Sequence, residues 1–122
     1  MVTLDFSDRN VLIVEDDVFL ALDLERVLDD AGCSVIGPAP SVERALARID
    51  DTRLDAALLD VNLGHELVFP VADRLCAEDV PFIFVTGDPS KVPERHWTRP
   101  IVTKPFLEPA LLEALAAVMR PH

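Results

Sequence analysis

Five short apolar runs alternate along the chain with longer segments in which apolar residues recur every three or four positions. The runs are continuously apolar rather than alternating, which is typical of strands that are covered on both faces. The intervening segments have the period of helices that bury one face. The predicted strands are residues 11–14, 33–37, 56–59, 81–85 and 101–103.

Capping residues and prolines indicate where the helices begin and end. Asp17 and Ser41 are placed to cap the first two helices, and Gly32 is placed to stop the first. Pro70 suits a first turn but not a helix interior, so the third helix should begin near it and leave residues 64–69 irregular. The predicted helices are residues 18–31, 41–49, about 70–77 and 109–119.

The segment between the last two strands, residues 87–100, breaks this regularity. It carries Pro89, Pro93 and Pro100 and has no helical period, so we expect a turn or two at most, with mobility. The whole alternation predicts an α/β fold, a flavodoxin-like doubly wound five-stranded parallel sheet with helices on both faces. Its expected strand order is 2-1-3-4-5, with a short or irregular fourth helix and ligands at the carboxyl ends of the strands.

The amino-acid composition excludes some classes of binding partner. The 122 residues include 22 acidic and 11 basic side chains, and the net charge of −11 disfavours nucleic acid and anionic membrane surfaces. Half of the residues are hydrophobic, enough for one core, but no apolar run approaches the roughly 20 residues of a membrane span. With no signal peptide or linker visible, we expect one cytoplasmic domain over residues 1–122, without an output domain.

Polar side chains follow four of the five predicted strands. Glu15 and Asp16 follow the first, Asp60 the third, Thr86 ends the fourth and Lys104 follows the fifth. Parallel strands bring these positions to one edge of the sheet. Carboxylates crowded in this way need a counterion, and oxygen ligands favour Mg²⁺. The first acids alone would also fit a solvated turn that caps a helix.

These residues resemble the receiver domain of bacterial two-component response regulators, over essentially the whole chain. Four short motifs carry the resemblance in the right order: residues 11–17 (VLIVEDD), 59–64 (LDVNLG), 84–87 (FVTG) and 103–106 (TKPF). Residues 81–87 further resemble a subgroup common in alphaproteobacteria, marked by a Phe-Ala-Thr-Gly-X-Tyr motif and often formed by stand-alone receivers with an irregular fourth helix.

The resemblance implies a role for each site residue. Asp60 would be the phosphoacceptor, and Lys104 and Thr86 would contact phosphoryl oxygens. Asp16, Asp60 and the backbone carbonyl of Asn62 would ligate Mg²⁺, with Glu15 assisting through a coordinated water. The resemblance also implies a cis peptide bond between Lys104 and Pro105.

The implied partners are a sensor histidine kinase, a histidine phosphotransferase, or both, with a possible downstream protein target. Output would pass by protein contact or onward phosphotransfer, or the chain would act as a phosphate sink, as a monomer or weak dimer. The chain also departs from the family, because Ile101 replaces the usual switch aromatic and Pro89 the subgroup's aromatic. Asp88, two residues past Thr86, is expected to alter dephosphorylation.

Two other functions stay open at this stage. A receiver-like interaction module that is never phosphorylated would explain Ile101 and Asp88, and a flavin-type cofactor binder could use the same sheet. Among lesser candidates, Phe19 and Leu20 either dock a kinase helix bundle or pack on the sheet, and His65 either touches the phosphoryl site or lies in solvent. His96 and Trp97 either form a partner-binding tip or, for Trp97, pack over the core edge.

Overall fold

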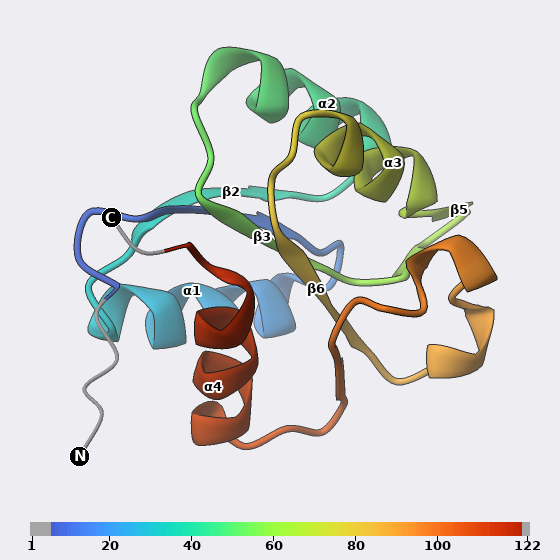
Figure 1. Ribbon diagram of the computed structural model, residues 1–122. Coiled ribbons are helices and arrows are strands. Elements are labelled where there is room, and N and C mark those ends of the chain that lie inside the picture. Colours follow the sequence, from blue (N-terminus) through green and yellow to red (C-terminus); the bar gives the residue numbers. More distant parts are fainter. Residues whose placement is uncertain (1–5, 121–122) are drawn as a thin grey trace.

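The computed structural model describes residues 6–120 and shows a five-stranded parallel sheet between two helical layers (Figure 1). The strand order β2-β1-β3-β6-β7 confirms the predicted 2-1-3-4-5 arrangement. Neighbouring strands run parallel throughout, as right-handed crossovers require. The strands are β1 (Asn10–Val14), β2 (Ser34–Ala39), β3 (Ala56–Leu59), β6 (Phe82–Thr86) and β7 (Ile101–Thr103).

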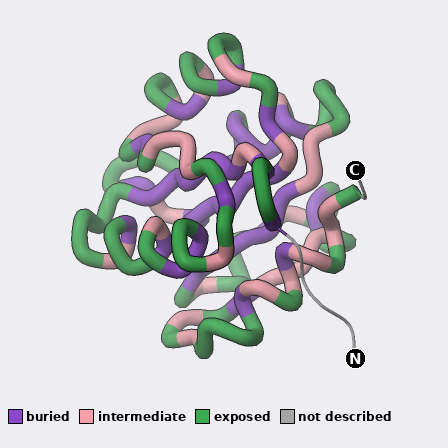
Figure 2. The backbone as a smooth tube through the Cα atoms, turned by 90° about the vertical axis from the view of Figure 1, so that its left-hand side faces the viewer, coloured by how far each residue is buried: buried purple, intermediate pink, exposed green. Residues whose placement is uncertain are grey.

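Two helices cover each face of the sheet. In Figure 1, α1 (Val18–Asp30) and α4 (Glu108–Val118) lie below the sheet, and α2 (Val42–Asp51) and α3 (Phe69–Ala77) lie above it. Each layer has its own apolar cluster, because successive strand residues point to opposite faces. Leu12 packs toward α2 and α3 and Ile13 toward the opposite layer, and both are fully buried. In Figure 2 the buried stretches run through the middle of the molecule, and the exposed stretches lie at its periphery.

The predicted caps hold the helix ends in place. Asp17 Oδ1 accepts hydrogen bonds from the backbone N–H groups of Phe19 and Leu20, at 2.9 and 3.1 Å. Ser41 caps α2 in the same way, and Gly32 follows α1 with a φ of +95°, a conformation that favours glycine. Helices α3 and α4 each begin one residue before the proline expected to open them.

Residues 64–69 are more regular than expected. A small antiparallel hairpin of β4 (Asn62–Leu63) and β5 (Glu66–Leu67) precedes α3, so the prediction of an irregular lead-in was wrong for its first half. Gly64 turns the chain at a φ of +72°, which makes a two-residue loop possible. The hairpin lies directly after the Asp60 strand end.

Between β6 and β7 the chain forms two short 3₁₀ turns, η1 (Pro89–Lys91) and η2 (Glu94–His96), where an α-helix would complete the alternation. This confirms the irregular fourth helix. The Trp97 indole N–H donates to the Val92 carbonyl at 2.9 Å, and the His96 ring packs among three phenylalanines. The segment is therefore anchored at its centre by side chains rather than by helical hydrogen bonds.

Candidate functional site

The register of the central strands brings three acids together. Val14 of β1 pairs with Leu59 of β3, and the Asp60 N–H donates to the Val14 carbonyl at 2.9 Å. The residues that follow the two strands are therefore neighbours at the carboxyl edge. One carboxylate oxygen from each of Glu15, Asp16 and Asp60 lies within 4.8 Å of the others.

The neighbouring pair of strands delivers the basic side chain. Thr86 of β6 pairs with Thr103 of β7, and the Lys104 N–H donates to the Thr86 carbonyl at 2.9 Å. From there the Lys104 ammonium reaches 2.9 Å from Glu15 Oε1 and 3.2 Å from Asp60 Oδ2. The peptide bond to Pro105 is cis, as expected, and Gly37–Pro38 is a second cis bond that the sequence did not indicate.

Burial and the neighbouring charges shift the pKa values of two side chains in this site. Glu15 and Asp60 are 2% and 8% exposed, whereas Asp16 lies at the surface. Burial, together with hydrogen bonding and repulsion from Asp60, raises the pKa of Glu15 to about 7, although Lys104 acts in the opposite direction. Burial also opposes the charge of Lys104, but the two carboxylates outweigh it and raise the pKa of Lys104.

The donor set fits a hard divalent cation. Three carboxylates converge with a single ammonium between two of them, so the described cluster keeps a surplus of negative charge. Mg²⁺ prefers oxygen ligands and a site that leaves room for water, and the exposed Asp16 provides an open side. Gly64 lies against this side, where an added Cβ would stand 3.4 Å from Asp16 Oδ2.

Thr86 and the start of the following segment border the site. Thr86 is fully buried, and its Oγ1 accepts a hydrogen bond from the Asp88 N–H at 3.0 Å. The Asp88 carboxylate accepts from the Ser90 hydroxyl at 2.7 Å. The sequence analysis assigned no role to Lys91, yet its ammonium donates to Asn62 Oδ1 at 3.0 Å and lies 3.7 Å from Asp88. The chain has two lysines, Lys91 and Lys104, and this scarcity was the available signal for Lys91.

The remaining candidate residues from the sequence analysis differ in how far they are exposed to solvent. His65 is exposed in the β4–β5 turn, and Phe19 is 84% exposed on α1, whereas Leu20 packs partly against the core. The hypothesis of a partner-binding tip is wrong for His96, which is 2% exposed with Nε2 2.8 Å from Asp73 Oδ1. Trp97, in contrast, remains 67% exposed.

The chain is similar in sequence to a known protein family. The family model for the response regulator receiver domain matches residues 11–116. This chain belongs to the response regulator receiver family. Within the described part of the receiver, residues 6–120, no helix is long and apolar enough to cross a membrane.

Two similar proteins give the receiver a closer context. It is 32% identical to the phyllosphere-induced regulator PhyR of Methylorubrum extorquens over 110 residues, which are 86% of this chain and 41% of PhyR. The solution structure of SdrG from Sphingomonas melonis Fr1 is 42% identical, with a TM-score of 0.77, over 91% of this chain and 96% of SdrG. The receiver thus spans less than half of the curated relative PhyR but nearly all of SdrG.

A second solution structure shows SdrG in its BeF₃-activated conformation. It is 41% identical to this receiver, with a TM-score of 0.78, and the match covers 93% of this chain and 98% of the SdrG chain. The resemblance to an alphaproteobacterial type of receiver therefore extends to a relative whose activated state has been captured.

Proposed function

We propose that this receiver accepts a phosphoryl group on Asp60 from a phosphohistidine, as one step of a two-component His–Asp phosphorelay. The observation that carries the proposal is the position of the Lys104 ammonium, 3.2 Å from Asp60 Oδ2 and 2.9 Å from Glu15 Oε1. A nucleophilic carboxylate at the rim of an acid cluster, with a fixed cation beside it, suits the transfer of an anionic group. The receiver is a phosphoacceptor rather than a turnover enzyme.

In the proposed step, an Asp60 oxygen attacks phosphorus, the phosphorus–nitrogen bond to the donor histidine breaks, and its electron pair returns to the imidazole. Lys104 stays beside the acceptor and pairs with a phosphoryl oxygen. Glu15, Asp16, Asp60 and the Asn62 carbonyl are the residues that would hold Mg²⁺. When bound, the metal would supply positive charge against the phosphoryl oxygens.

The SdrG comparison supports this chemistry. BeF₃ bound to a carboxylate has the shape and charge of a phosphoryl group, and SdrG adopts an activated conformation with it. In this receiver, Thr86 would report the same event, because its hydroxyl can donate to a phosphoryl oxygen while its Oγ1 already accepts from Asp88. The signal would then pass into residues 87–100, since Ile101 offers no aromatic ring to swing.

An apolar surface on α1 supports a helical protein partner, namely a sensor histidine kinase or a histidine phosphotransferase. Val18, Phe19 and Leu22 are 67%, 84% and 57% exposed, and Leu107 before α4 is 76% exposed. Val18 and Phe19 open α1 directly after the acids that follow β1, and Leu107 follows Lys104 by three residues. Phosphotransfer profiling against the kinases of the source organism tests this contact: Phe19→Ala should slow transfer from the kinase while leaving uptake from a small phosphodonor unchanged.

The phosphoacceptor itself is tested with a small phosphodonor and Mg²⁺, followed by intact-mass measurement. We expect the unaltered chain to gain one phosphoryl group and Asp60→Asn to gain none, because the amide cannot act as the nucleophile. Asp29→Asn, which changes an exposed aspartate on α1 far from the site, is the matched control. Uptake that persists in Asp60→Asn would show that another residue accepts the group and would overturn the assignment of Asp60. Uptake that is absent from the unaltered chain would favour the alternative of a non-phosphorylated interaction module.

A further inference from the structure

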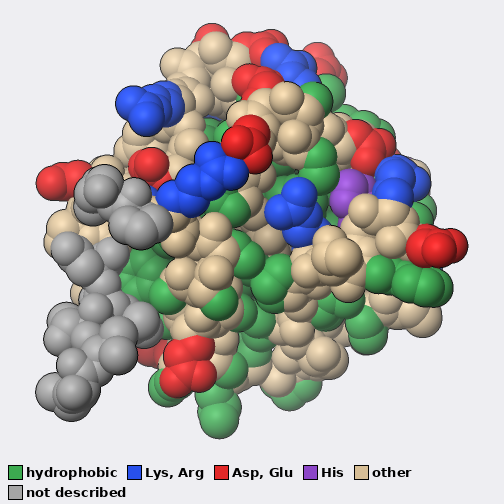
Figure 3. Space-filling view, viewed as in Figure 1, with side chains coloured by type: hydrophobic (Ala, Val, Ile, Leu, Met, Phe, Trp, Pro, Cys, Tyr) green, Lys and Arg blue, Asp and Glu red, His purple; other side chains and the backbone are tan. Residues whose placement is uncertain are grey.

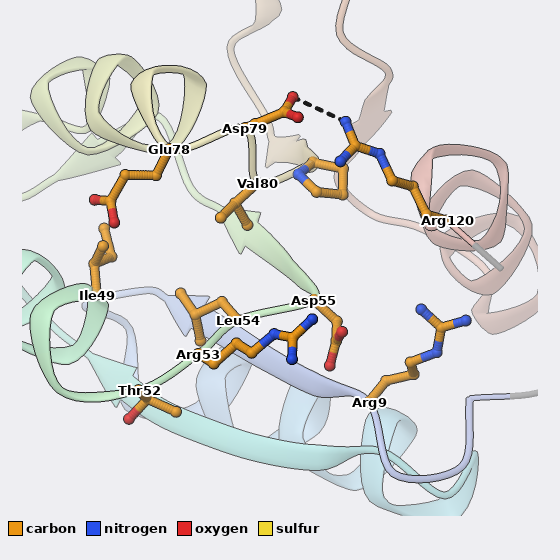
Figure 4. Close-up of a pocket in the computed structure, with 11 residues that line it drawn as sticks. Arg9, Ile49, Thr52, Arg53, Leu54, Asp55, Glu78, Asp79, Val80 and Arg120 are labelled. Carbon is orange, nitrogen blue, oxygen red and sulfur yellow. Dashed lines mark hydrogen bonds and ion pairs between the residues drawn. The ribbon is translucent and has the colours of Figure 1, made fainter. Parts of the chain in front are cut away.

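A cavity lined by described residues lies at the opposite end of the sheet from the acid cluster. Its volume is about 550 Å³, within the range of small-molecule sites. The segments that line it precede β1, β3 and β6 or follow α4, so it opens at the amino edge of the sheet (Figure 4). The proposed phosphorylation uses none of its residues.

Three arginines from three separate segments line this cavity: Arg9, Arg53 and Arg120. In the view of Figure 4, the Arg9 and Arg53 guanidinium groups lie on either side of Asp55, and Arg120 lies across from Arg9. In the space-filling view of Figure 3, the visible Lys and Arg side chains lie in the upper half, with Asp and Glu side chains among them.

Arg9 is the decisive residue, because it is only 7% exposed and its Nε has no hydrogen-bond partner among residues 6–120. Its backbone is fixed: the N–H donates to the Phe6 carbonyl at 3.2 Å, and the carbonyl accepts from Ser34 at 2.8 Å. A buried guanidinium without a counterion is costly, and proteins normally pair it. Here the fold holds the group in place and leaves it unpaired.

None of the three acids that line the cavity, Asp55, Glu78 and Asp79, forms an ion pair with Arg9 or Arg53. Asp79 pairs with Arg120 at 2.8 Å, and Glu78 pairs with Arg74, which is outside the cavity. Asp55 Oδ2 accepts from the Asn10 N–H at 2.7 Å. Within the described residues, neither Arg9 nor Arg53 forms an ion pair or a side-chain hydrogen bond. Two guanidinium groups on one cavity therefore stand ready for an external anion.

We propose that this cavity binds a small organic anion, with its phosphoryl or carboxylate group held by Arg9 and Arg53. Guanidinium groups offer planar pairs of N–H donors that match both oxyanions. Leu54 and Val80 line the same cavity and supply apolar wall for the rest of the ligand. The volume exceeds what a single phosphate or carboxylate would fill.

The test is a titration followed through backbone amide resonances, with pyrophosphate and citrate as the two probes, in buffer freed of metal by a chelating resin so that the acid cluster holds none. Saturable shifts centred on residues 9, 52–55 and 78–81 support the site, and the tighter probe identifies the oxyanion. No saturable shift with either probe, or shifts centred on residues 15, 16 and 60, would overturn it.

Substitutions of single arginines test which side chains bind the anion. Arg53→Gln should weaken binding about threefold to tenfold, as expected for one charge-assisted hydrogen bond at an exposed position. Arg48→Gln, which removes an equally exposed charge from α2 outside the cavity, should leave binding unchanged. Arg9→Met should weaken binding at least about tenfold without lowering the melting temperature in anion-free buffer, because it removes an unpaired buried charge. Equal effects of the Arg53 and Arg48 changes would refute the proposal.

Discussion

The two ends of the sheet differ in how their basic side chains are paired with acids. At the carboxyl edge, Lys104 lies between Glu15 and Asp60, so a half-buried cation and two buried acids partly satisfy one another. At the amino edge, Arg9 is buried with its Nε unpartnered, and Arg53 beside it is unpaired within residues 6–120. At the carboxyl edge the protein itself supplies the opposite charge, through Lys104. At the amino edge, the anion that we propose for Arg9 and Arg53 must come from a ligand.

The largest expected effect comes from breaking the pairing at the carboxyl edge. Lys104→Met removes the cation beside Asp60, so the proposed transfer loses the group that offsets charge on the phosphoryl oxygens. We expect the rate of phosphoryl uptake from a small donor to fall about 10²- to 10³-fold. Time-resolved intact-mass measurement with Mg²⁺ present would show this directly.

Lys91→Met is the matched control for that change. It removes the chain's other lysine, whose ammonium donates to Asn62 rather than to Asp60. Uptake should then change far less than in Lys104→Met. Equal losses in the two variants would show that total positive charge near the site matters and that the position of Lys104 does not.

A pH effect of intermediate size follows from Glu15. Its pKa is raised from 4.5 to about 7 in the folded chain, so between these values the folded state binds more protons than the unfolded state. Stability must therefore fall as the pH rises from about 4.5 to above 7. In EDTA we expect a loss of about 2 kcal/mol, less than the full shift implies, because water reaches the site past the exposed Asp16.

Urea denaturation at a series of pH values would measure that loss. Glu15→Gln should flatten the profile over this range, because the amide does not titrate. Arg9 at the other edge should contribute nothing to the slope, since guanidinium groups stay charged throughout. A profile that rises with pH, or one that Glu15→Gln leaves unchanged, would contradict the burial argument.

The fold was predictable because its signals are local and repeated. Continuous apolar runs indicated buried parallel strands, Asp17 and Ser41 capped the helices where expected, and three prolines ruled out a regular helix in residues 87–100. The β4–β5 hairpin was missed because two-residue strands carry no periodic pattern. Its one signal, Gly64, fits a loop as well as a turn between strands.

The two edges differ in how far sequence could reveal them. The acids, Thr86 and Lys104 each follow or end an apolar run, so the parallel topology alone brought them together. Arg9, Arg53 and Arg120 lie outside the predicted elements at positions where scattered arginines normally face solvent. Only coordinates show that Arg9 is buried and unpaired, because burial at a loop position depends on segments distant in the sequence.

The smallest expected effect concerns Asp88, which lies where the carboxyl edge meets the irregular segment. Its N–H bonds to Thr86 Oγ1, and its carboxylate, held by the Ser90 hydroxyl, lies 3.7 Å from the Lys91 ammonium. A carboxylate two residues past Thr86, at the border of the site, can accept a hydrogen bond from a water that approaches the phosphoryl group. Asp88→Ala should therefore slow the loss of the phosphoryl group about fivefold, the value of one such hydrogen bond.

Asp88→Asn distinguishes two ways in which Asp88 could act: by orienting a water molecule through a hydrogen bond, or through its negative charge. The amide oxygen still accepts a hydrogen bond, so this variant should retain most of the rate if Asp88 orients water, and should match Asp88→Ala if the negative charge is what matters. The decay of phosphorylated protein after removal of the donor, followed by mass, gives both rates. An unchanged rate in Asp88→Ala would mean that the carboxyl edge depends on Glu15, Asp60 and Lys104 alone and that Asp88 serves the loop.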